Sequence, residues 1–210
     1  MPYCAITADV RGSREVEDRA GLQKQILAAI AAVNTEFEQE LLVPFAISVG
    51  DEWQGLLKSI APAWRIVLAF QDTLHEYDLA FGIGEGEIAT PIAERSAEMD
   101  GEAFHRSREA LESAKESEKP AEFRTTTPNI DLLLNALVSA MNIISSGWTD
   151  RQRETVRLYR RMKSVSKVAE AQGVTRMSAS KTLLSLNAQQ FRECERRIDE
   201  YLRARVGKNQ

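Results

Sequence analysis

The chain has 210 residues, of which 43% are hydrophobic and 28% charged, with a net charge of −4. This is ordinary globular usage and fits one large domain or two small ones. No run of 18 apolar residues occurs, and the N-terminus lacks the basic start and long apolar centre of a signal peptide. We therefore expect a cytoplasmic protein with no membrane partner. Cys4 and Cys194 lie at opposite ends without Cys-x-x-Cys spacing, which argues against a zinc site.

The charge is distributed unevenly along the chain. Residues 1–146 contain 12 Lys and Arg against 24 Asp and Glu, a net charge of −12, whereas residues 147–210 contain 15 against 7, a net charge of +8. This asymmetry predicts two modules with different partners. Only the second is suited to a polyanion.

The first half alternates strand and helix patterns. Residues 3–8 predict a buried strand that ends at Asp9, and an apolar stripe from Leu22 to Leu41 predicts a helix ended by Pro44. Two strands, 45–49 and 53–57, then flank the tip Gly50-Asp51-Glu52, as in a hairpin. A helix over about 62–75 and a glycine-interrupted strand over 79–88 follow.

This order predicts an α+β domain over residues 1–127. We expect the ferredoxin-like type, with an antiparallel sheet and helices on one of its faces. Residues 100–119 are charged and helical in pattern, and residues 118–128 are polar and favour a connector. The strongly apolar helix predicted within 128–147 then connects the modules as a buried hub.

Residues 148–210 predict an all-α domain with a helix-turn-helix. Val168 and Ala169 would face a partner helix, Gly173 would provide the turn, and Ala179 and Leu183 would seat the second helix. The outward positions of that second helix would contact double-stranded DNA, with Arg176 as the first choice for a base contact: Thr175, Arg176, Met177, Ser180 and Lys181.

Basic residues on the preceding helix, including Arg151 and Arg157, would neutralise phosphates. The alternative is a solvated three-helix bundle with incidental positive charge that serves protein interaction. An apolar seam from Phe191 to Val206 predicts a terminal helix that either pairs two chains in a homodimer or packs back on its own domain.

Two aspartates stand at the ends of predicted neighbouring strands. Asp9 follows the first strand, and Asp51 lies at the hairpin tip. If their side chains converge, two carboxylates with phosphate oxygens and water could hold Mg²⁺, which prefers hard oxygen ligands. The alternative is a surface loop and a solvated turn, with two charges that repel each other. Glu52 would point to the other face of its strand, so it is given no ligand role.

Three motifs carry a resemblance to known families. Ala8-Asp9-Val10-x-Gly12-Ser13, Val49-Gly50-Asp51-Glu52-Trp53 and the Gly82–Ile88 strand resemble, in order and separation, the sheet motifs of class III nucleotidyl cyclases. The Gly-Asp-Glu-Trp tip is also similar to diguanylate cyclases of the GGDEF type. With residues 100–111 and the C-terminal helices included, the whole chain resembles the bacterial SatD family.

The resemblance implies a ligand and a chemistry. In cyclases the two aspartates bind Mg²⁺ and the triphosphate, so Asp9 and Asp51 are the implied metal ligands. A nucleotide-like ligand is then expected at Gly12, Ser13, Gly50 and Arg108. The helix that carries Arg108 has no asparagine at the position where cyclases have one. We therefore interpret the chain as a DNA-binding regulator with a ligand-binding cyclase-like domain. The alternatives are a Mg²⁺-dependent cyclase or phosphoryl-transfer enzyme, and an interaction protein on an inherited scaffold.

Overall fold

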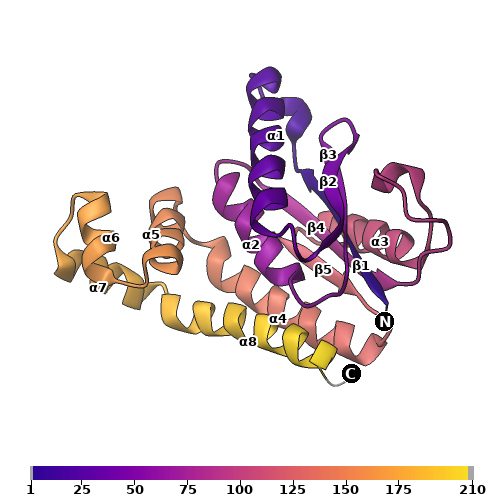
Figure 1. Ribbon diagram of the computed structural model, residues 1–210. Helices are drawn as coiled ribbons and strands as arrows, with labels where there is room; N and C mark the ends of the chain where they lie inside the picture. The colour runs from indigo at the N-terminus through magenta and orange to yellow at the C-terminus, as the bar shows by residue number, and fades with distance from the viewer. Residues whose placement is uncertain (1, 208–210) are drawn as a thin grey trace. The chain divides into compact units, whose positions relative to one another are not determined.

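The computed structural model describes residues 2–207, which form two compact units (Figure 1). The first unit joins the chain up to Val138 with the segment from Ile198 onward, and the second comprises Ser139–Arg197. Two long helices, α4 (Pro128–Ser146) and α8 (Ala188–Gly207), each contribute residues to both units. The predicted connecting helix at 128–147 is thus divided between the two units. The end of the predicted 148–210 domain, from Ile198 onward, belongs to the first unit.

The first unit is an α+β domain built on a mixed five-stranded sheet. Its strands are ordered β2-β3-β1-β4-β5, with bounds Tyr3–Val10 for β1, Leu41–Val49 for β2, Glu52–Leu57 for β3, Leu79–Gly86 for β4 and Ala121–Arg124 for β5. The predicted hairpin is present, and β1 pairs antiparallel with both β3 and β4. This register places the end of β1 beside the hairpin tip.

Strand β5 was not predicted, and it makes the sheet mixed. The polar stretch expected to be a connector contains Ala121–Arg124, which pairs parallel with β4, so Phe81 lies opposite Ala121. Ala121 and Phe123 are fully buried and Arg124 is exposed. A four-residue alternation is too short to distinguish a strand from a polar loop.

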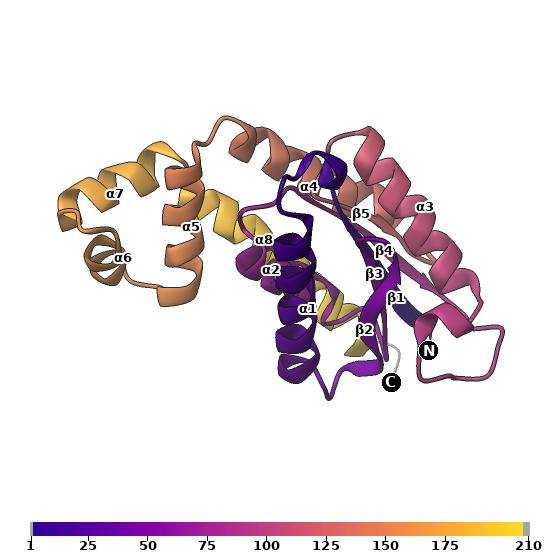
Figure 2. The same cartoon turned by 90° about the horizontal axis from the view of Figure 1, so that it is seen from above.

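Helices cover both faces of the sheet, which corrects the expectation of one covered face (Figure 2). Helices α1 (Arg19–Glu36) and α2 (Ala63–Thr73) lie on one face, and α3 (Glu102–Glu116) lies on the other, chiefly against β4. An ideal Cβ on Gly84 would stand 2.2 Å from the backbone nitrogen of Ser107 in α3. The glycines of β4 therefore let α3 approach the strand backbone directly.

Helix α1 ends earlier than its apolar stripe suggests. Its C-cap is Phe37, whose N–H bonds to the carbonyl of Val33, and Leu41 begins β2. Pro44 lies inside β2 and does not end the helix. Because β2 is an edge strand, a residue without an N–H is tolerated there.

An aromatic cluster fills the core between the sheet and α2. Phe70 of α2 contacts Trp53 at 5.4 Å and Phe81 at 6.1 Å between ring centroids. Helix α4 is less buried than the predicted hub, since Leu133 is 73% exposed while Leu134 is 5% exposed. Among the described residues, α4 alone is long and apolar enough to cross a membrane by length and composition, a test that core helices also pass.

The second unit contains α5 (Asp150–Met162), α6 (Val165–Gln172) and α7 (Arg176–Ser185). Its apolar centre consists of Leu158, Val168, Ala169 and Ala179. Thr149 and Gln152 form a capping box at the start of α5. Trp148 packs on Phe191 at 4.9 Å between centroids, which ties both ends of the unit together.

The last turns of α8 belong to the first unit. Ile198 and Leu202 are fully buried within the chain, and Asp199 pairs with Arg65 of α2 at 3.4 Å. These residues therefore pack on the first unit, and not on the rest of the predicted 148–210 domain as one of the two alternatives had it. They are not available as a seam for a second copy while this packing holds.

Candidate functional site

The carboxyl groups of Asp9 and Asp51 lie on the same side of the sheet, as the predicted site requires. Asp9 lies near the end of β1 and Asp51 at the tip between β2 and β3, close enough for Asp51 to raise the pKa of Asp9. The Oδ2 atom of Asp51 is buried without a hydrogen-bond partner among the described residues. The tip is therefore one side of an acidic site and not a fully solvated turn.

Lys115 of α3 completes this cluster. Its Nζ lies 2.6 Å from Oδ2 of Asp9 and 3.4 Å from Oε1 of Glu112. Burial raises the pKa of Asp9, and the neighbouring Asp51 adds to that effect against the opposing influence of Lys115. Burial alone would lower the pKa of Lys115, but its hydrogen bond to Asp9 and the charge of Asp9 raise it overall.

The loop after β1 is fixed to the end of α3 by Arg11. Its guanidinium pairs with Asp78 at 2.9 Å and donates to the carbonyls of Ala114, at 3.0 Å, and Lys119. A cation at the C-terminus of a helix is favourably placed. Gly12 then has a φ of +65° and starts a short 3-10 helix, η1 (Ser13–Glu15). Gly12 is exposed, whereas Ser13 is 8% exposed and faces inward.

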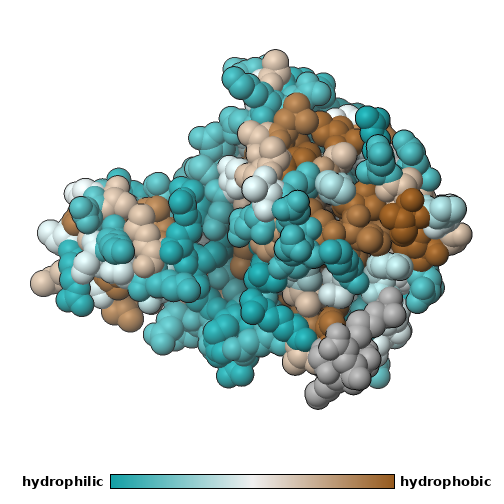
Figure 3. Space-filling model, viewed as in Figure 1, coloured by the Kyte–Doolittle hydropathy of each residue, from teal (hydrophilic) through white to brown (hydrophobic). Residues whose placement is uncertain are grey.

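The other predicted ligand-binding residues lie around the hairpin tip. Gly50 is exposed with a φ of +62°. Arg108 of α3 is 62% exposed and lies 3.7 Å from Glu52, which also accepts a hydrogen bond from Ser48 at 2.8 Å. Glu52 and Asp9 thus both pair with α3. In the view of Figure 3, apolar atoms gather over the hairpin, where Val49 is 73% exposed.

A buried polar layer lies between the sheet and α3 beneath this cluster. The hydroxyl groups of Thr7 and Ser107 are 2.9 Å apart, and the amide nitrogen of Gln54 donates to the Thr7 oxygen at 2.8 Å. Thr7 and Ser107 are fully buried and Gln54 is 4% exposed. Because these groups satisfy one another, they fix the register of α3 on the sheet and so position Lys115 and Arg108.

The donor set is compatible with one Mg²⁺ under a specific condition. Asp9 and Asp51 offer hard oxygen ligands, and Oδ2 of Asp51 has no competing hydrogen bond among the described residues. Lys115 would have to leave Oδ2 of Asp9 before a cation could use that atom. No group of three His, Cys, Asp or Glu side chains suited to a metal occurs among the described residues. Water and ligand oxygens would have to supply the rest of the coordination.

Helix α7 presents the residues predicted to contact DNA. Thr175 is its N-cap, and its side-chain oxygen accepts from the N–H of Ser178 at 3.1 Å. Arg176 and Lys181 are exposed, Met177 is 68% exposed, and Ser180 is half-buried. Within residues 2–207, neither Arg176 nor Lys181 forms an ion pair. Their charges are therefore free to meet an external partner.

The predicted phosphate contacts on α5 are less uniform. Arg151 is exposed, with its Nη2 atom 3.5 Å from the carbonyl of Gln172. The Arg157 side chain is only 15% exposed and pairs with Glu154 at 3.7 Å, so it is largely committed within the unit. Arg160 is likewise turned inward and forms a salt bridge with Glu195, which is 4% exposed.

Two features of the sites were not predicted. Lys115 lies seven residues after Arg108, which places both side chains on one side of α3. Once α3 is known to cover the sheet, this spacing indicates that Lys115 lies on the same side as Arg108. The buried pair of Glu85 and Arg205 joins residues 120 positions apart. Nothing in the local sequence of either residue points to the other.

The chain was compared with family models, solved structures and curated proteins. The SatD family model matches residues 3–205. Three solved structures share 15–16% identity with the chain. An EAL/GGDEF domain protein from M. capsulatus has a TM-score of 0.43, and the alignment covers 60% of this chain and 86% of that one. The active GGEEF domain of a diguanylate cyclase from Vibrio cholerae has a TM-score of 0.40, with coverages of 60% and 84%.

A guanylyl cyclase has a TM-score of 0.37, with coverages of 54% of this chain and 70% of that one. A search of curated proteins found no match. The match to the family model runs through both compact units, from β1 to the last turns of α8. On this match, the chain belongs to the SatD family.

Proposed function

We propose that this protein is a DNA-binding transcriptional regulator whose first unit binds a nucleotide or another phosphorylated small molecule. The observation that carries the proposal is the surface of α7. There Arg176 and Lys181 are exposed beside the exposed Met177 and form no ion pair with any described residue. An arginine near the start of such a helix can reach guanine edges in the major groove.

The local geometry of α6 and α7 supports a helix-turn-helix. Gly173 has a φ of +63° and ends α6, a backbone conformation that glycine adopts without strain. Thr175 then caps α7. Val168 and Ala169 of α6 meet Ala179 of α7 in the apolar centre, so the two helices cross closely through small side chains.

The charge of the second unit supports a polyanionic partner. Residues 139–197 contain 12 Lys and Arg against 5 Asp and Glu, a net charge of +7. Several of these cations are paired internally, as Arg157 and Arg160 are. The remaining exposed cations would contact phosphates, and sequence would be read by α7. Paired half-sites require two copies, so the proposal includes a homodimer.

Fluorescence anisotropy with labelled genomic fragments tests DNA binding by the full chain. Affinity should fall as salt rises, because phosphate contacts release counterions. Arg176→Ala should weaken specific binding by about 1–3 kcal/mol, roughly 5- to 150-fold. The matched control is Arg197→Ala, which removes the same charge from an exposed position of α8 and should have a much smaller effect. The proposal is refuted if the affinity for every fragment is independent of salt, or if Arg176→Ala and Arg197→Ala lower the affinity equally.

A second candidate function is Mg²⁺-dependent nucleotidyl cyclisation or phosphoryl transfer, because Asp9 and Asp51 converge. When bound, Mg²⁺ would neutralise phosphate charge and orient the reacting oxygens. The two carboxylates would hold it, and Lys115, once released from Asp9, would join Arg108 in stabilising charge on the phosphate oxygens. The polar layer beneath α3 would keep both cations in place.

Incubation with each nucleoside triphosphate and Mg²⁺ or Mn²⁺, followed by chromatography, tests this candidate. A product that depends on Asp51 would support it, and the control is Asp51→Ala in the same preparation. If wild type forms no more product than Asp51→Ala, catalysis at this site is excluded. Binding of a nucleotide without turnover would leave the regulator as the function.

A further inference from the structure

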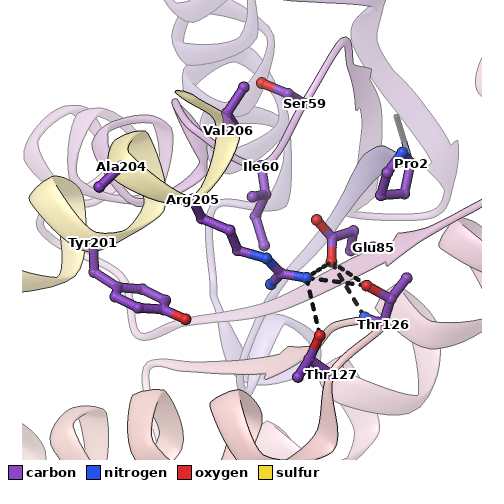
Figure 4. Close-up of a pocket in the computed structure, with 10 residues that line it drawn as sticks. All are labelled: Pro2, Ser59, Ile60, Glu85, Thr126, Thr127, Tyr201, Ala204, Arg205 and Val206. Atoms are coloured by element: carbon purple, nitrogen blue, oxygen red, sulfur yellow. Dashed lines mark hydrogen bonds and ion pairs between the residues drawn. The ribbon is translucent and has the colours of Figure 1, made fainter. Parts of the chain in front are cut away.

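A pocket of about 420 Å³ lies in the first unit, at the end of the sheet away from Asp9 (Figure 4). In the register of β1 and β4, Cys4 lies opposite Glu85 and Asp9 opposite Ala80. The two places are thus five residue steps apart along β1, roughly 17 Å of extended strand. The walls come from the start of β1, the turn after β3, the segment before α4 and the last turns of α8, and include Ser59, Ile60, Thr127, Tyr201 and Val206.

A buried ion pair forms the floor of this pocket. The Glu85 side chain is 4% exposed and the Arg205 side chain 13%. Oε2 of Glu85 accepts from the N–H and the hydroxyl of Thr126 at 3.2 and 3.0 Å, and it also contacts Nη2 of Arg205. Nη2 further donates to the hydroxyls of Thr126 and Thr127, at 3.0 and 3.5 Å.

One atom on each side of this ion pair is left without a partner. Nη1 of Arg205 is buried and has no hydrogen-bond partner among the described residues. Within residues 2–207, the hydrogen bonds to the Glu85 carboxylate all fall on Oε2, and none reaches Oε1. For the buried Nη1 atom, the missing partner costs about 1–3 kcal/mol, and native proteins usually satisfy such a group with water or a ligand.

The charges decide which ligand suits these atoms. The floor is neutral overall, with a free donor on its cationic side and a free acceptor on its anionic side. A simple anion would meet Arg205 but be repelled by Glu85, and a simple cation would face the reverse. We propose that the pocket binds a small zwitterion, namely a free α-amino acid, with its carboxylate toward Arg205 and its ammonium toward Glu85.

The surrounding groups match this orientation. In Figure 4 the side chains of Tyr201 and Thr127 lie on the Arg205 side of the ion pair, where their hydroxyls can donate to a carboxylate. Ile60 lies above the Arg205 guanidinium in the same view, and apolar walls of this kind can accept the side chain of the amino acid. A volume of about 420 Å³ falls within the usual range for small-molecule sites.

The ligand would also act on α8. Tyr201 and Arg205 belong to the turns of α8 that pack on the sheet, so a molecule bridging them to Glu85 stabilises that packing. The ligand shifts the equilibrium toward the state in which α8 packs on the sheet. The size of that shift equals the difference between the ligand's affinities for the packed and the unpacked states. This inference uses none of the residues assigned to DNA or to the Asp9 site and stands or falls independently of both.

Thermal melting and isothermal titration of the full chain, with free L-amino acids one at a time, test the proposal. At least one should raise Tm by several degrees at about 100 times its Kd. Acetate and methylamine at the same concentration, each carrying one of the two charges, should not. Failure of every amino acid to bind overturns the proposal, and so does equal binding of acetate, which would indicate a site for anions only.

Two variants locate the site. Glu85→Gln keeps the shape of the side chain but removes its negative charge. The variant should therefore bind the amino acid at least about tenfold more weakly. Glu87→Gln, at the exposed acid two residues along, is its matched control and should bind as wild type does. If Glu85→Gln does not fold, Tyr201→Phe removes one hydroxyl from a side chain that is 41% exposed and should weaken binding several-fold. Unchanged affinity in the folded variants overturns the assignment.

Discussion

Gly84→Ala should strongly destabilise the first unit. An added Cβ would stand 2.2 Å from the backbone nitrogen of Ser107 and 2.3 Å from the carbonyl oxygen of Ala103. Overpacking against side chains costs about 1–3 kcal/mol, and here the neighbours are helix backbone atoms that cannot rotate away. We therefore expect the free energy of unfolding to fall by at least about 3 kcal/mol. The substitution also lowers the entropy of the unfolded chain, but this offsets less than about 1 kcal/mol of the loss.

Calorimetry of the full chain measures this effect. For a chain of this size, about 2–4 °C per kcal/mol gives a fall in Tm of roughly 6–12 °C. The matched control is Gly147→Ala, because an added Cβ at Gly147 meets no atom within 4 Å. That variant should melt as wild type does or slightly higher. If Gly84→Ala melts with the control, α3 does not lie directly on β4, and the positions of Lys115 and Arg108 would have to be revised.

Three further predictions concern charge and capping. Arg160→Ala leaves the buried carboxylate of Glu195 with Arg192, at 3.7 Å, as its remaining ion-pair partner among the described residues. The variant should lower the free energy of unfolding, measured in urea, by about 3 kcal/mol; an unchanged midpoint would contradict the buried pair. Thr175→Ala should cost about 1 kcal/mol through the lost cap of α7, whereas Thr175→Ser should cost far less. Because the pKa of Asp9 is raised in the folded state, its contribution favours folding at low pH and is lost as pH rises from the ordinary aspartate pKa through the raised one. Asp9→Asn should remove that dependence from stability measured between about pH 3 and pH 7; an unaltered profile would refute it.

The convergence of Asp9 and Asp51 was predictable because it depends on short-range patterns. A strand that ends in a carboxylate and a hairpin with an acidic tip need only lie side by side in the sheet. The outward face of α7 was predictable for the same reason, since Gly173 and Thr175 fix where the helix begins. In both places the relevant residues lie within a few positions of the turn that orients them.

The arrangement of α3 was not predictable from such patterns. Glycines in β4 indicate that something approaches the strand, but the sequence does not distinguish a helix from a ligand. The closest approach is made by Ser107 and Leu111, whose own surroundings in the sequence are charged and typical of a solvated helix. Because α3 was left out of the sheet packing, Lys115 was missed as the partner of Asp9.

The two ends of the sheet share a physical arrangement that bears on regulation. At each end a shielded carboxylate on a strand is paired with a cation from a later helix, Asp9 with Lys115 of α3 and Glu85 with Arg205 of α8. A shielded carboxylate without its cation is costly, so each pair holds its helix to the sheet. A ligand that supplies its own charges can replace part of that interaction. Ligands at either end would therefore change how firmly a helix is held while the five-stranded sheet keeps its form.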